Sequence, residues 1–232
     1  MMNWKQLISA KRFGMEEFHE ERQENRSEFQ RDYDRLIFSA PFRRLQNKTQ
    51  VFPLPGSVFV HNRLTHSLEV ASVGRSLGDD VAKALLERHP ELQDSFLPEI
   101  GSIVSAACLA HDLGNPPFGH SGEKAISTFF SEGKGVRLKE KQPNGEQLSP
   151  MEWEDLTHFE GNANAFRILT HQFEGRRKGG FVLTYTTLAS IVKYPFSSSL
   201  AGKKSKFGFF VSEEESYRKI ATELGLIQLS EQ

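Results

Sequence analysis

Two histidines and an aspartate in this sequence could together form a hydrolytic metal site. His111 and Asp112 are adjacent and follow the apolar run 103–110, and His66 lies upstream of them. Imidazole and carboxylate are ligand types that borderline and hard divalent metals share, so they fit Mn, Mg, Fe or Zn without separating these metals. The residue types therefore predict a divalent metal site with His66, His111 and Asp112 as ligands.

The apolar run that precedes His111 and Asp112 is expected to position these two residues. Residues 103–110 are apolar on nearly every side, which predicts a buried helix. Two polar groups at its buried end need partners, and a metal ion satisfies both. Gly114 is expected to end the helix, and Pro116 and Pro117 are expected to fix a loop that cannot continue it.

A third histidine follows this loop. Ser121 is suited to cap a new helix over 123–130, which would place His120 and Glu123 near its N-terminus and on one side. Such a helix end attracts phosphate. A histidine held there by a carboxylate is a candidate general acid or an aid to a nucleophile.

Each histidine alone also suits a structural role. His66 can open a helix that continues through Leu85, and His111 can interact favourably with the dipole at a helix C-terminus while Asp112 is exposed. The His-Asp pair, the loop 114–119 and another histidine lie within ten residues of each other. Helix capping does not require that combination, so the combination favours the metal site.

Four segments of the chain are similar to the HD-domain deoxynucleoside triphosphate triphosphohydrolases, often called dGTPases. They are Tyr33-Asp-Arg-Leu-Ile-Phe-Ser-Ala-Pro-Phe-Arg-Arg-Leu-Gln46, Arg63-Leu-Thr-His66, His111-Asp-Leu-Gly-Asn-Pro-Pro-Phe-Gly-His120 and Phe159-Glu-Gly-Asn-Ala-Asn164. The resemblance covers roughly residues 30 to 200, far more than a bare His-Asp pair. It implies an all-α fold, an HD-domain phosphohydrolase helical bundle with extended loops. It also implies hydrolysis of a dNTP, with dGTP expected, to the deoxynucleoside and inorganic triphosphate.

The resemblance implies roles for individual residues as well. His66, His111 and Asp112 match metal ligands, and His120 with its partner Glu123 is expected near the scissile phosphoester. The implied substrate contacts are Gln50 at the sugar and base, Arg63 at a phosphate, His158 and Asn162 in a further segment, and Lys193 and Tyr194 at the triphosphate. Without the resemblance, the sequence favours an ordinary turn residue at Gln50, and Arg63 also suits a surface ion pair. His158 can simply precede a helix, and Lys193 equally suits the dipole at a helix C-terminus.

One feature departs from the family pattern. Family members complete the metal shell with an aspartate after the Lys-Tyr-Pro segment, and this chain has no aspartate after Tyr194. Glu213, Glu214 and Glu215 are typical of the acidic first turn of a terminal helix rather than of metal ligands. We therefore expect the N-terminal part of a longer enzyme, one that alone binds metal weakly, hydrolyses dNTPs poorly and self-associates. The apolar residues expected to be exposed in that case are Phe207, Phe209 and Phe210.

Composition excludes several classes of protein. A chain of 232 residues with a net charge of −1 can bury a core and is not a globally basic nucleic-acid binder. Local basic runs around a dNTP pocket still make single-stranded DNA a possible partner. The complete protein is expected to be a homo-oligomer. The single Cys108 excludes an intrachain disulfide. No stretch has transmembrane length and no signal-peptide pattern is present, so a cytoplasmic protein without membrane contact is expected.

We expect one HD-domain region over residues 1–232. The highly charged residues 1–32 predict an N-terminal helical arm anchored by Trp4, Leu7 and Ile8, and the polar residues 133–150 predict a long surface loop. Residues 184–192 are rich enough in β-branched residues for a strand, but their apolar spacing also suits a helix, which the resemblance favours. Residues 202–210 predict a short hairpin or a mobile loop.

Two alternatives to dNTP hydrolysis stay open. Another HD-type enzyme, a nucleotidase or a cyclic-nucleotide phosphodiesterase, shares the His-Asp chemistry and does not need Gln50 or the Lys-Tyr-Pro segment. A non-catalytic nucleotide- or DNA-binding module fits the missing aspartate. Release of inorganic triphosphate from a dNTP separates the first function from both alternatives.

Overall fold

The computed structural model describes residues 3–17, 26–48, 62–143, 145–175, 178–201 and 206–227. Within these ranges the regular secondary structure is helical, and β pairing is limited to two isolated β-bridges. The predicted all-α fold is confirmed. None of the helices in the described ranges combines the length and the apolarity needed to cross a lipid bilayer.

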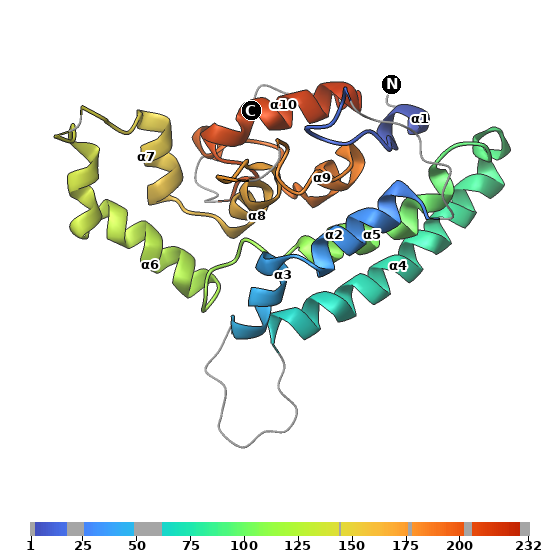
Figure 1. The fold of residues 1–232 in the computed structure, drawn as a ribbon, viewed down its shortest axis with the longest axis horizontal. Coiled ribbons are helices and arrows are strands. Elements are labelled where there is room, and N and C mark those ends of the chain that lie inside the picture. Colours follow the sequence, from blue (N-terminus) through green and yellow to red (C-terminus); the bar gives the residue numbers. More distant parts are fainter. Residues whose placement is uncertain are drawn as a thin grey trace, which may run out of the picture.

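The helices follow one another with connections of different length (Figure 1). The α helices are α1 (Trp4–Leu7), α2 (Glu28–Ile37), α3 (Ala40–Arg44), α4 (Arg63–Arg88), α5 (Ile100–Ala110), α6 (His120–Ser131), α7 (Pro150–Thr157), α8 (Gly161–Thr170), α9 (Tyr185–Ile191) and α10 (Glu214–Glu223). The 3-10 helices are Leu45–Asn47, Pro90–Leu92, Leu97–Glu99, Lys134–Lys139, Ser198–Leu200 and Val211–Glu213.

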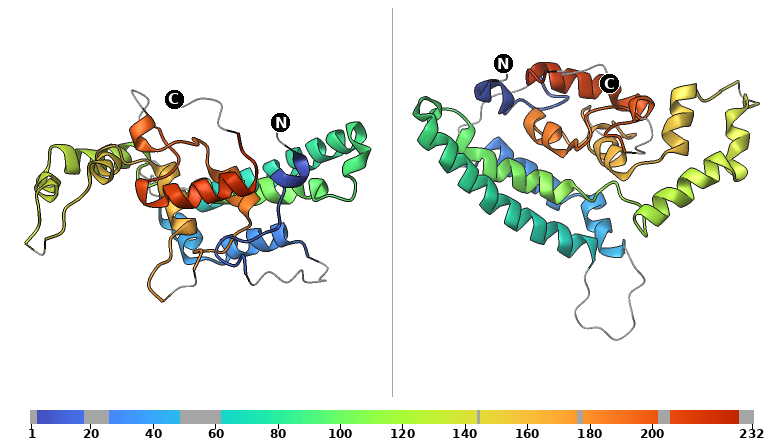
Figure 2. Two further views of the ribbon diagram at one scale, coloured as in Figure 1. Left: turned by 90° about the horizontal axis from the view of Figure 1, so that it is seen from above. Right: turned by 180° about the vertical axis from the view of Figure 1, so that it is seen from behind.

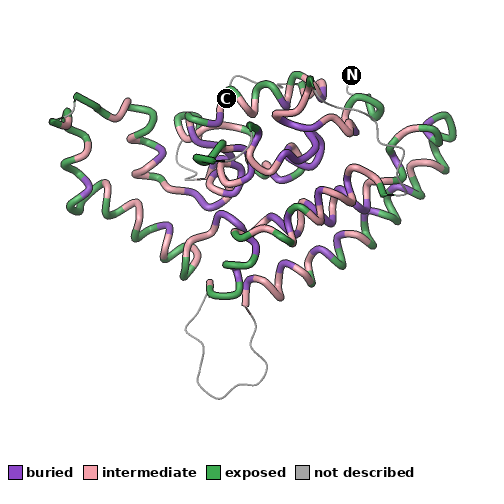
Figure 3. The backbone as a smooth tube through the Cα atoms, in the orientation of Figure 1, coloured by how far each residue is buried: buried purple, intermediate pink, exposed green. Residues whose placement is uncertain are grey.

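Helix α5 lies at the centre of the fold and packs against α2, α4 and α9. Its residues Ile103, Ala106, Leu109 and Ala110 are almost fully buried, as the apolar run 103–110 predicts. Buried residues concentrate along α5 and α9 in Figure 3, whereas α6 and α7 have one buried residue each, Glu123 and Asp155. Both views in Figure 2 show α6 extending away from the helices around α5, whereas α7 packs against the 3-10 helices Ser198–Leu200 and Val211–Glu213. The core therefore surrounds the helix that ends at the His-Asp pair.

Glycines allow α4 and α5 to approach closely as an antiparallel pair. A Cβ atom at Gly78 would lie 2.7 Å from the Cα of Gly101, and one at Gly74 would lie 2.7 Å from the Sγ of Cys108. Both distances are shorter than van der Waals contact, so larger residues would push the helices apart. The close pairing brings the first turn of α4 beside the last turn of α5.

The prediction of a helical arm over residues 1–32 is wrong for the described residues between α1 and α2. Helix α1 ends at Leu7, and the following backbone pairs with the segment before α9: the Phe13 N–H donates to the Leu183 carbonyl at 3.0 Å. Ile8 and Phe13 are buried. Burial of these apolar side chains and the long-range hydrogen bonds outweigh local helix propensity.

Among the other predictions, the helix after Thr184 is confirmed, the segment 133–150 is only partly a loop, and the exposure of three phenylalanines is wrong. Residues 133–150 are mainly exposed but contain the 3-10 helix Lys134–Lys139, and residues 185–191 form a helix whose N-cap is Thr184. The expected exposure of Phe207, Phe209 and Phe210 is wrong, because they are 0%, 5% and 8% exposed. Phe207 and Phe210 pack with Ala163 and Phe159, and the ring of Phe209 stacks on that of Tyr217 at 4.5 Å.

Glu16 makes the fold sensitive to acid. Its Oε1 atom accepts hydrogen bonds from the Lys219 ammonium, the Tyr185 hydroxyl and the Gly14 N–H. Partial burial acts to raise the pKa of Glu16, but these hydrogen bonds outweigh it and lower the pKa to about 2. Since the folded pKa lies below the unfolded value, the carboxylate stabilises the fold above about pH 4.5, and this stability is lost as the pH falls toward 2.

We therefore expect Glu16→Gln to lower the free energy of unfolding more at pH 7 than at pH 3. Urea unfolding followed by circular dichroism at both pH values measures the difference. The neighbouring exposed residue provides the control, because Glu17→Gln is expected to have a small effect at either pH. An equal loss for Glu16→Gln at both pH values would contradict the pKa assignment.

Candidate metal centre

His66, His111 and Asp112 converge at the end of the α4–α5 pair. Each offers one ligand atom, and these three atoms lie within 4.8 Å of one another. The imidazole rings of His66 and His111 meet edge to face, with their centroids 5.3 Å apart. Metal bonds of about 2.0–2.2 Å place ligand atoms roughly 3–4.4 Å apart, so small side-chain movements bring all three to bonding distance. The donor set fits a divalent metal.

The start of α4 orients His66. Asn62 and Thr65 form a capping box, in which Asn62 Oδ1 accepts from the Thr65 N–H at 3.0 Å and Thr65 Oγ1 accepts from the Asn62 N–H at 3.2 Å. The helix therefore begins at Arg63, three residues before His66. Because residues three apart share a helix face, Arg63 and His66 both face the end of α5.

The tautomer of His111 leaves one ring nitrogen available for a metal. Its Nδ1 atom lies 2.6 Å from the carbonyl oxygen of Cys108. A carbonyl only accepts hydrogen bonds, so Nδ1 carries the proton and donates. In the neutral tautomer the Nε2 atom then has the lone pair, and it lies 3.5 Å from Oδ1 of Asp112. A backbone carbonyl that fixes the ring in this way is the usual support of a metal-binding histidine.

Asp112 is a buried carboxylate held by two donors. Its Oδ2 atom accepts from Nη1 of Arg63 at 2.8 Å, and its Oδ1 atom accepts from Nδ2 of Asn115 at 2.5 Å. Arg63 is itself only 3% exposed, and its buried Nε atom has no hydrogen-bond partner. The guanidinium therefore orients the Asp112 carboxylate in this structure. Contact of Arg63 with a substrate phosphate stays a prediction.

The loop after Asp112 returns to Arg63 just before His120. Phe118 and Gly119 both adopt positive φ, and a Cβ atom at Gly119 would lie 3.0 Å from Nη2 of Arg63. The chain thus passes directly against the arginine that holds Asp112. Helix α6 begins at His120 with Gly119 as its N-cap, so the expected cap at Ser121 is wrong. His120 is exposed at this helix end.

Glu123 lies in a cluster of charged residues that the sequence motifs did not indicate. Its Oε1 atom accepts from the Gly161 N–H at 2.9 Å, and Lys206 lies 3.4 Å from its Oε2 atom. Lys206 also donates to the fully buried Glu160 at 2.7 Å. Burial acts to lower the pKa of Lys206, but the two carboxylates outweigh it and raise that pKa. Glu123 thus pairs with Gly161 and Lys206 rather than with His120.

Lys48 is a second residue that the motifs did not indicate. Its ammonium donates to the carbonyl oxygen of Leu113 at 3.2 Å. Burial lowers the pKa of Lys48, the positive charges of Arg63 and Arg44 lower it further, and Asp112 opposes them. No sequence spacing connects Lys48 with Leu113, so only the tertiary structure identifies this contact.

The remaining predicted substrate residues lie on three other elements. His158 caps the end of α7, where its Nδ1 atom is 2.9 Å from Glu154, and Asn162 donates to Glu160 at the start of α8. Lys193 lies over the Tyr194 ring, with Nζ 5.4 Å from the ring centroid, just after α9. Gln50 falls outside the described residues. The substrate contacts of all four described residues stay predictions.

Glu213 illustrates why the late glutamates do not replace the expected aspartate. Its side chain is 3% exposed and accepts from Nη1 of Arg167 at 2.6 Å. Glu214 and Glu215 stand in the first turn of α10, as predicted. Among the described residues, the potential metal ligands that cluster are His66, His111 and Asp112.

Comparisons with known proteins agree with this geometry. A family model described as HD domain matches residues 63–177, which include all three residues of the donor set. A deoxyguanosinetriphosphate triphosphohydrolase-like protein of Synechocystis sp. is 46% identical over 235 residues, 97% of this chain and 52% of that protein. One of Listeria monocytogenes is 38% identical over 230 residues, 95% of this chain and 49% of that protein.

A relative whose name does not end in "-like protein" is also similar. The deoxyguanosinetriphosphate triphosphohydrolase of Yersinia enterocolitica is 36% identical over 261 residues, 97% of this chain and 49% of that protein. The chain spans about half the length of the curated relatives it matches. With the HD-domain match, the helical fold and the likeness along nearly all of its length, the chain belongs to the HD-domain family of the deoxyguanosinetriphosphate triphosphohydrolase-like proteins.

Proposed function

We propose that this protein takes part in metal-dependent hydrolysis of deoxynucleoside triphosphates, dGTP among them, to the deoxynucleoside and inorganic triphosphate. The observation that carries the proposal is the donor set of His66, His111 and Asp112, whose ligand atoms lie within 4.8 Å of one another. The names of the relatives support the substrate class. Chemistry at a phosphoester suits a site that combines hard and borderline metal ligands.

Some site residues would bind the metal, and others hold the metal ligands in place. When bound, a divalent ion supplies Lewis acidity toward the phosphate and lowers the pKa of water. Arg63 holds the Asp112 carboxylate in place, and the Cys108 carbonyl holds the His111 ring. These supports fix two of the three ligands before any substrate arrives, which reduces the reorganisation that catalysis requires.

His120 is the candidate to supply a proton. In the proposed reaction a water oxygen bonds to the α-phosphorus, the bond from phosphorus to the 5′-oxygen breaks, and the 5′-oxygen needs a proton to leave as the deoxynucleoside hydroxyl. His120 begins α6, is exposed, and follows the loop that lies against Arg63. An exposed imidazole at the start of a helix, next to a residue that lies against Arg63, suits that proton transfer.

The product distinguishes this function from those of other HD enzymes. The protein is incubated with dGTP and with Mn²⁺, Mg²⁺, Fe²⁺ or Zn²⁺ in turn, and the products are separated by ion-exchange chromatography. We expect deoxyguanosine and inorganic triphosphate in equal amounts. Release of single phosphate or pyrophosphate instead, or dGTP binding without any product, would contradict the proposal.

His120→Ala should separate proton transfer from metal binding. In whichever form of the protein releases triphosphate, we expect turnover to fall by about 10²–10⁴-fold, the usual contribution of general acid catalysis, while the metal content stays unchanged. Triphosphate release and elemental analysis measure the two quantities. Lys124→Ala, at an exposed position on the same helix, is the control. Loss of metal together with activity would assign His120 to the donor set instead.

A further inference from the structure

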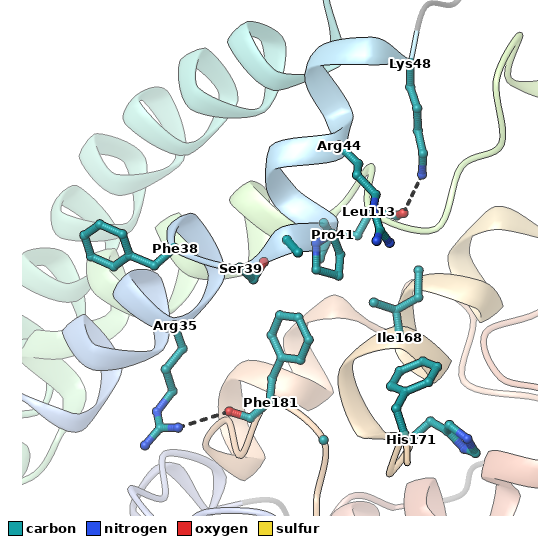
Figure 4. A pocket seen from close by; sticks show the side chains of 13 residues that line it. Arg35, Phe38, Ser39, Pro41, Arg44, Lys48, Leu113, Ile168, His171 and Phe181 are labelled. Carbon is teal, nitrogen blue, oxygen red and sulfur yellow. Dashed lines mark hydrogen bonds between the residues drawn. The ribbon is translucent and has the colours of Figure 1, made fainter. Parts of the chain in front are cut away.

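The turn that directly follows the donor set is held from two sides. On one side, the ammonium of Lys48 donates to the carbonyl oxygen of Leu113 at 3.2 Å, as the dashed line in Figure 4 shows. On the other side, Nδ2 of Asn164 in α8 donates to the carbonyl oxygen of Gly114 at 2.8 Å. A Cβ atom at Gly114 would lie only 2.0 Å from the carbonyl oxygen of Gly161, so a larger residue does not fit there. The turn therefore rests on the first turn of α8.

Asn115 ends this turn and holds one particular oxygen of Asp112. Its Nδ2 atom donates to Oδ1 of Asp112 at 2.5 Å. The same oxygen lies 3.5 Å from Nε2 of His111, so Oδ1 and Nε2 are the two atoms that one metal ion can join. A carboxylate oxygen has two lone pairs, and it can accept from Asn115 and still bind a metal. Asn115 therefore orients the oxygen that faces the other ligand.

Gly161, the first residue of α8, determines where the Asn115 side chain can lie. A Cβ atom at Gly161 would lie 2.2 Å from Oδ1 of Asn115 and 2.9 Å from Oε1 of Glu123. The Gly161 N–H also donates to that oxygen of Glu123 at 2.9 Å. Gly161 does not adopt positive φ, so the space around it, and not the backbone conformation, requires a glycine. One residue of α8 thus contacts side chains from both ends of the segment 115–123.

We propose that the first turn of α8 positions the metal centre, with Gly161 and Asn115 as positioning residues for Asp112. Gly161 leaves the space that the Asn115 amide occupies, and that amide orients the ligand oxygen of Asp112. The N–H of Gly161 holds Glu123 in a fixed place relative to the same ligand. This positioning rests on the proposed function, because it matters only if the donor set binds a metal.

Asn115→Ala tests the orienting hydrogen bond. We expect the affinity for Mn²⁺ to fall by about 10- to 100-fold, the usual effect of losing a group that supports a metal ligand. Equilibrium dialysis measures this affinity. Asn115 is only partly buried, so thermal unfolding without metal should change little. An Asn115→Ala chain that binds Mn²⁺ as tightly as the unaltered chain would overturn the proposal.

A double-mutant cycle tests whether Gly161 acts through Asn115. Gly161→Ala alone should weaken Mn²⁺ binding about as much as Asn115→Ala, because the added methyl group displaces the amide. In the Asn115→Ala background, Gly161→Ala should cause a further loss of less than about twofold, since the side chain that it displaces is gone. The contact with Glu123 remains in that background but involves no residue of the donor set. Losses that add fully in the double variant would contradict the positioning role of Gly161.

A glycine at the other end of α6 provides the matched control. A Cβ atom at Gly133 would lie 2.8 Å from the carbonyl oxygen of Phe129, so Gly133→Ala introduces similar crowding away from the donor set. This variant should retain the Mn²⁺ affinity of the unaltered chain. An equal loss of affinity in Gly133→Ala and Gly161→Ala would show that crowding anywhere in this region disturbs the site, which overturns the specific role of α8.

His111→Ala distinguishes failure of the positioning from failure of the proposed function. If His111→Ala weakens Mn²⁺ binding but Asn115→Ala and Gly161→Ala do not, the donor set binds a metal and the positioning by α8 is wrong. If the unaltered chain binds no Mn²⁺ in the same dialysis, both the metal centre and its positioning are wrong. Losses in all three variants, with Gly133→Ala unchanged, are the result that we expect.

Discussion

His111→Ala is expected to weaken divalent metal binding by about 100-fold or more, because substitutions that only support a ligand already weaken binding by about 10- to 100-fold. The variant removes the Nε2 donor, and the His111 side chain is 37% exposed, so its loss leaves no large cavity. Equilibrium dialysis with Mn²⁺ or Zn²⁺ measures the affinity relative to the unaltered chain. Thermal unfolding without metal should change little.

A distant histidine on the same helix pair is the control for this measurement. His89 follows the far end of α4, is exposed, and pairs with Glu91 at 3.2 Å. His89→Ala should therefore retain the metal affinity of the unaltered chain. Equal metal binding by His111→Ala and the unaltered chain would show that the convergence of His66, His111 and Asp112 does not form a metal site.

Arg12→Ala is expected to lower the free energy of unfolding by about 3–5 kcal/mol, the usual cost of removing one partner from a buried ion pair. Arg12 Nη1 donates to Oδ1 of the fully buried Asp32 at 2.7 Å and to the Val182 carbonyl at 2.7 Å. Thr184 donates to the other oxygen of Asp32. Burial raises the pKa of Asp32, and Arg12 opposes this rise. Without Arg12, the buried carboxylate loses its counter-charge.

The adjacent lysine makes a matched control for Arg12. Lys11 pairs with Glu223 at 2.9 Å, but both side chains are more than a third exposed. Exposed ion pairs contribute about 0–1 kcal/mol, so Lys11→Ala should change stability little. Urea unfolding measures both variants. A loss below about 1 kcal/mol for Arg12→Ala would show that the Arg12–Asp32 pair does not stabilise the packing of the N-terminal segment.

Which residues form the candidate metal site was predictable from the sequence. Imidazole and carboxylate identify the chemistry by type alone, and the apolar run 103–110 indicates the buried helix that ends at His111 and Asp112. The spacing after Thr184 suited a helix as well as a strand, and the resemblance favoured the helix that is observed. The glutamates near the C-terminus predicted the acidic first turn of α10. These features depend on neighbours a few residues apart, and a linear pattern contains that information.

The errors concern segments whose state depends on distant residues. The N-terminal segment was expected to be a helical arm, yet it pairs with residues 183–185, and Phe207, Phe209 and Phe210 were expected to be exposed, yet they are buried. The high charge of the N-terminal segment suggested an exposed helix. The expected loss of a covering C-terminal segment suggested that the three phenylalanines are exposed. Neither feature says which surface of the same chain lies nearby.

The sequence by itself determined the helical class, the ligand types and the helices on which the ligands lie. The tertiary structure decided the partners of those side chains: Arg63 with Asp112, Lys206 with Glu123 and Glu160, and Lys48 with the Leu113 carbonyl. These pairs join residues far apart in the chain, and their strength depends on burial and orientation, which follow only when the helices pack.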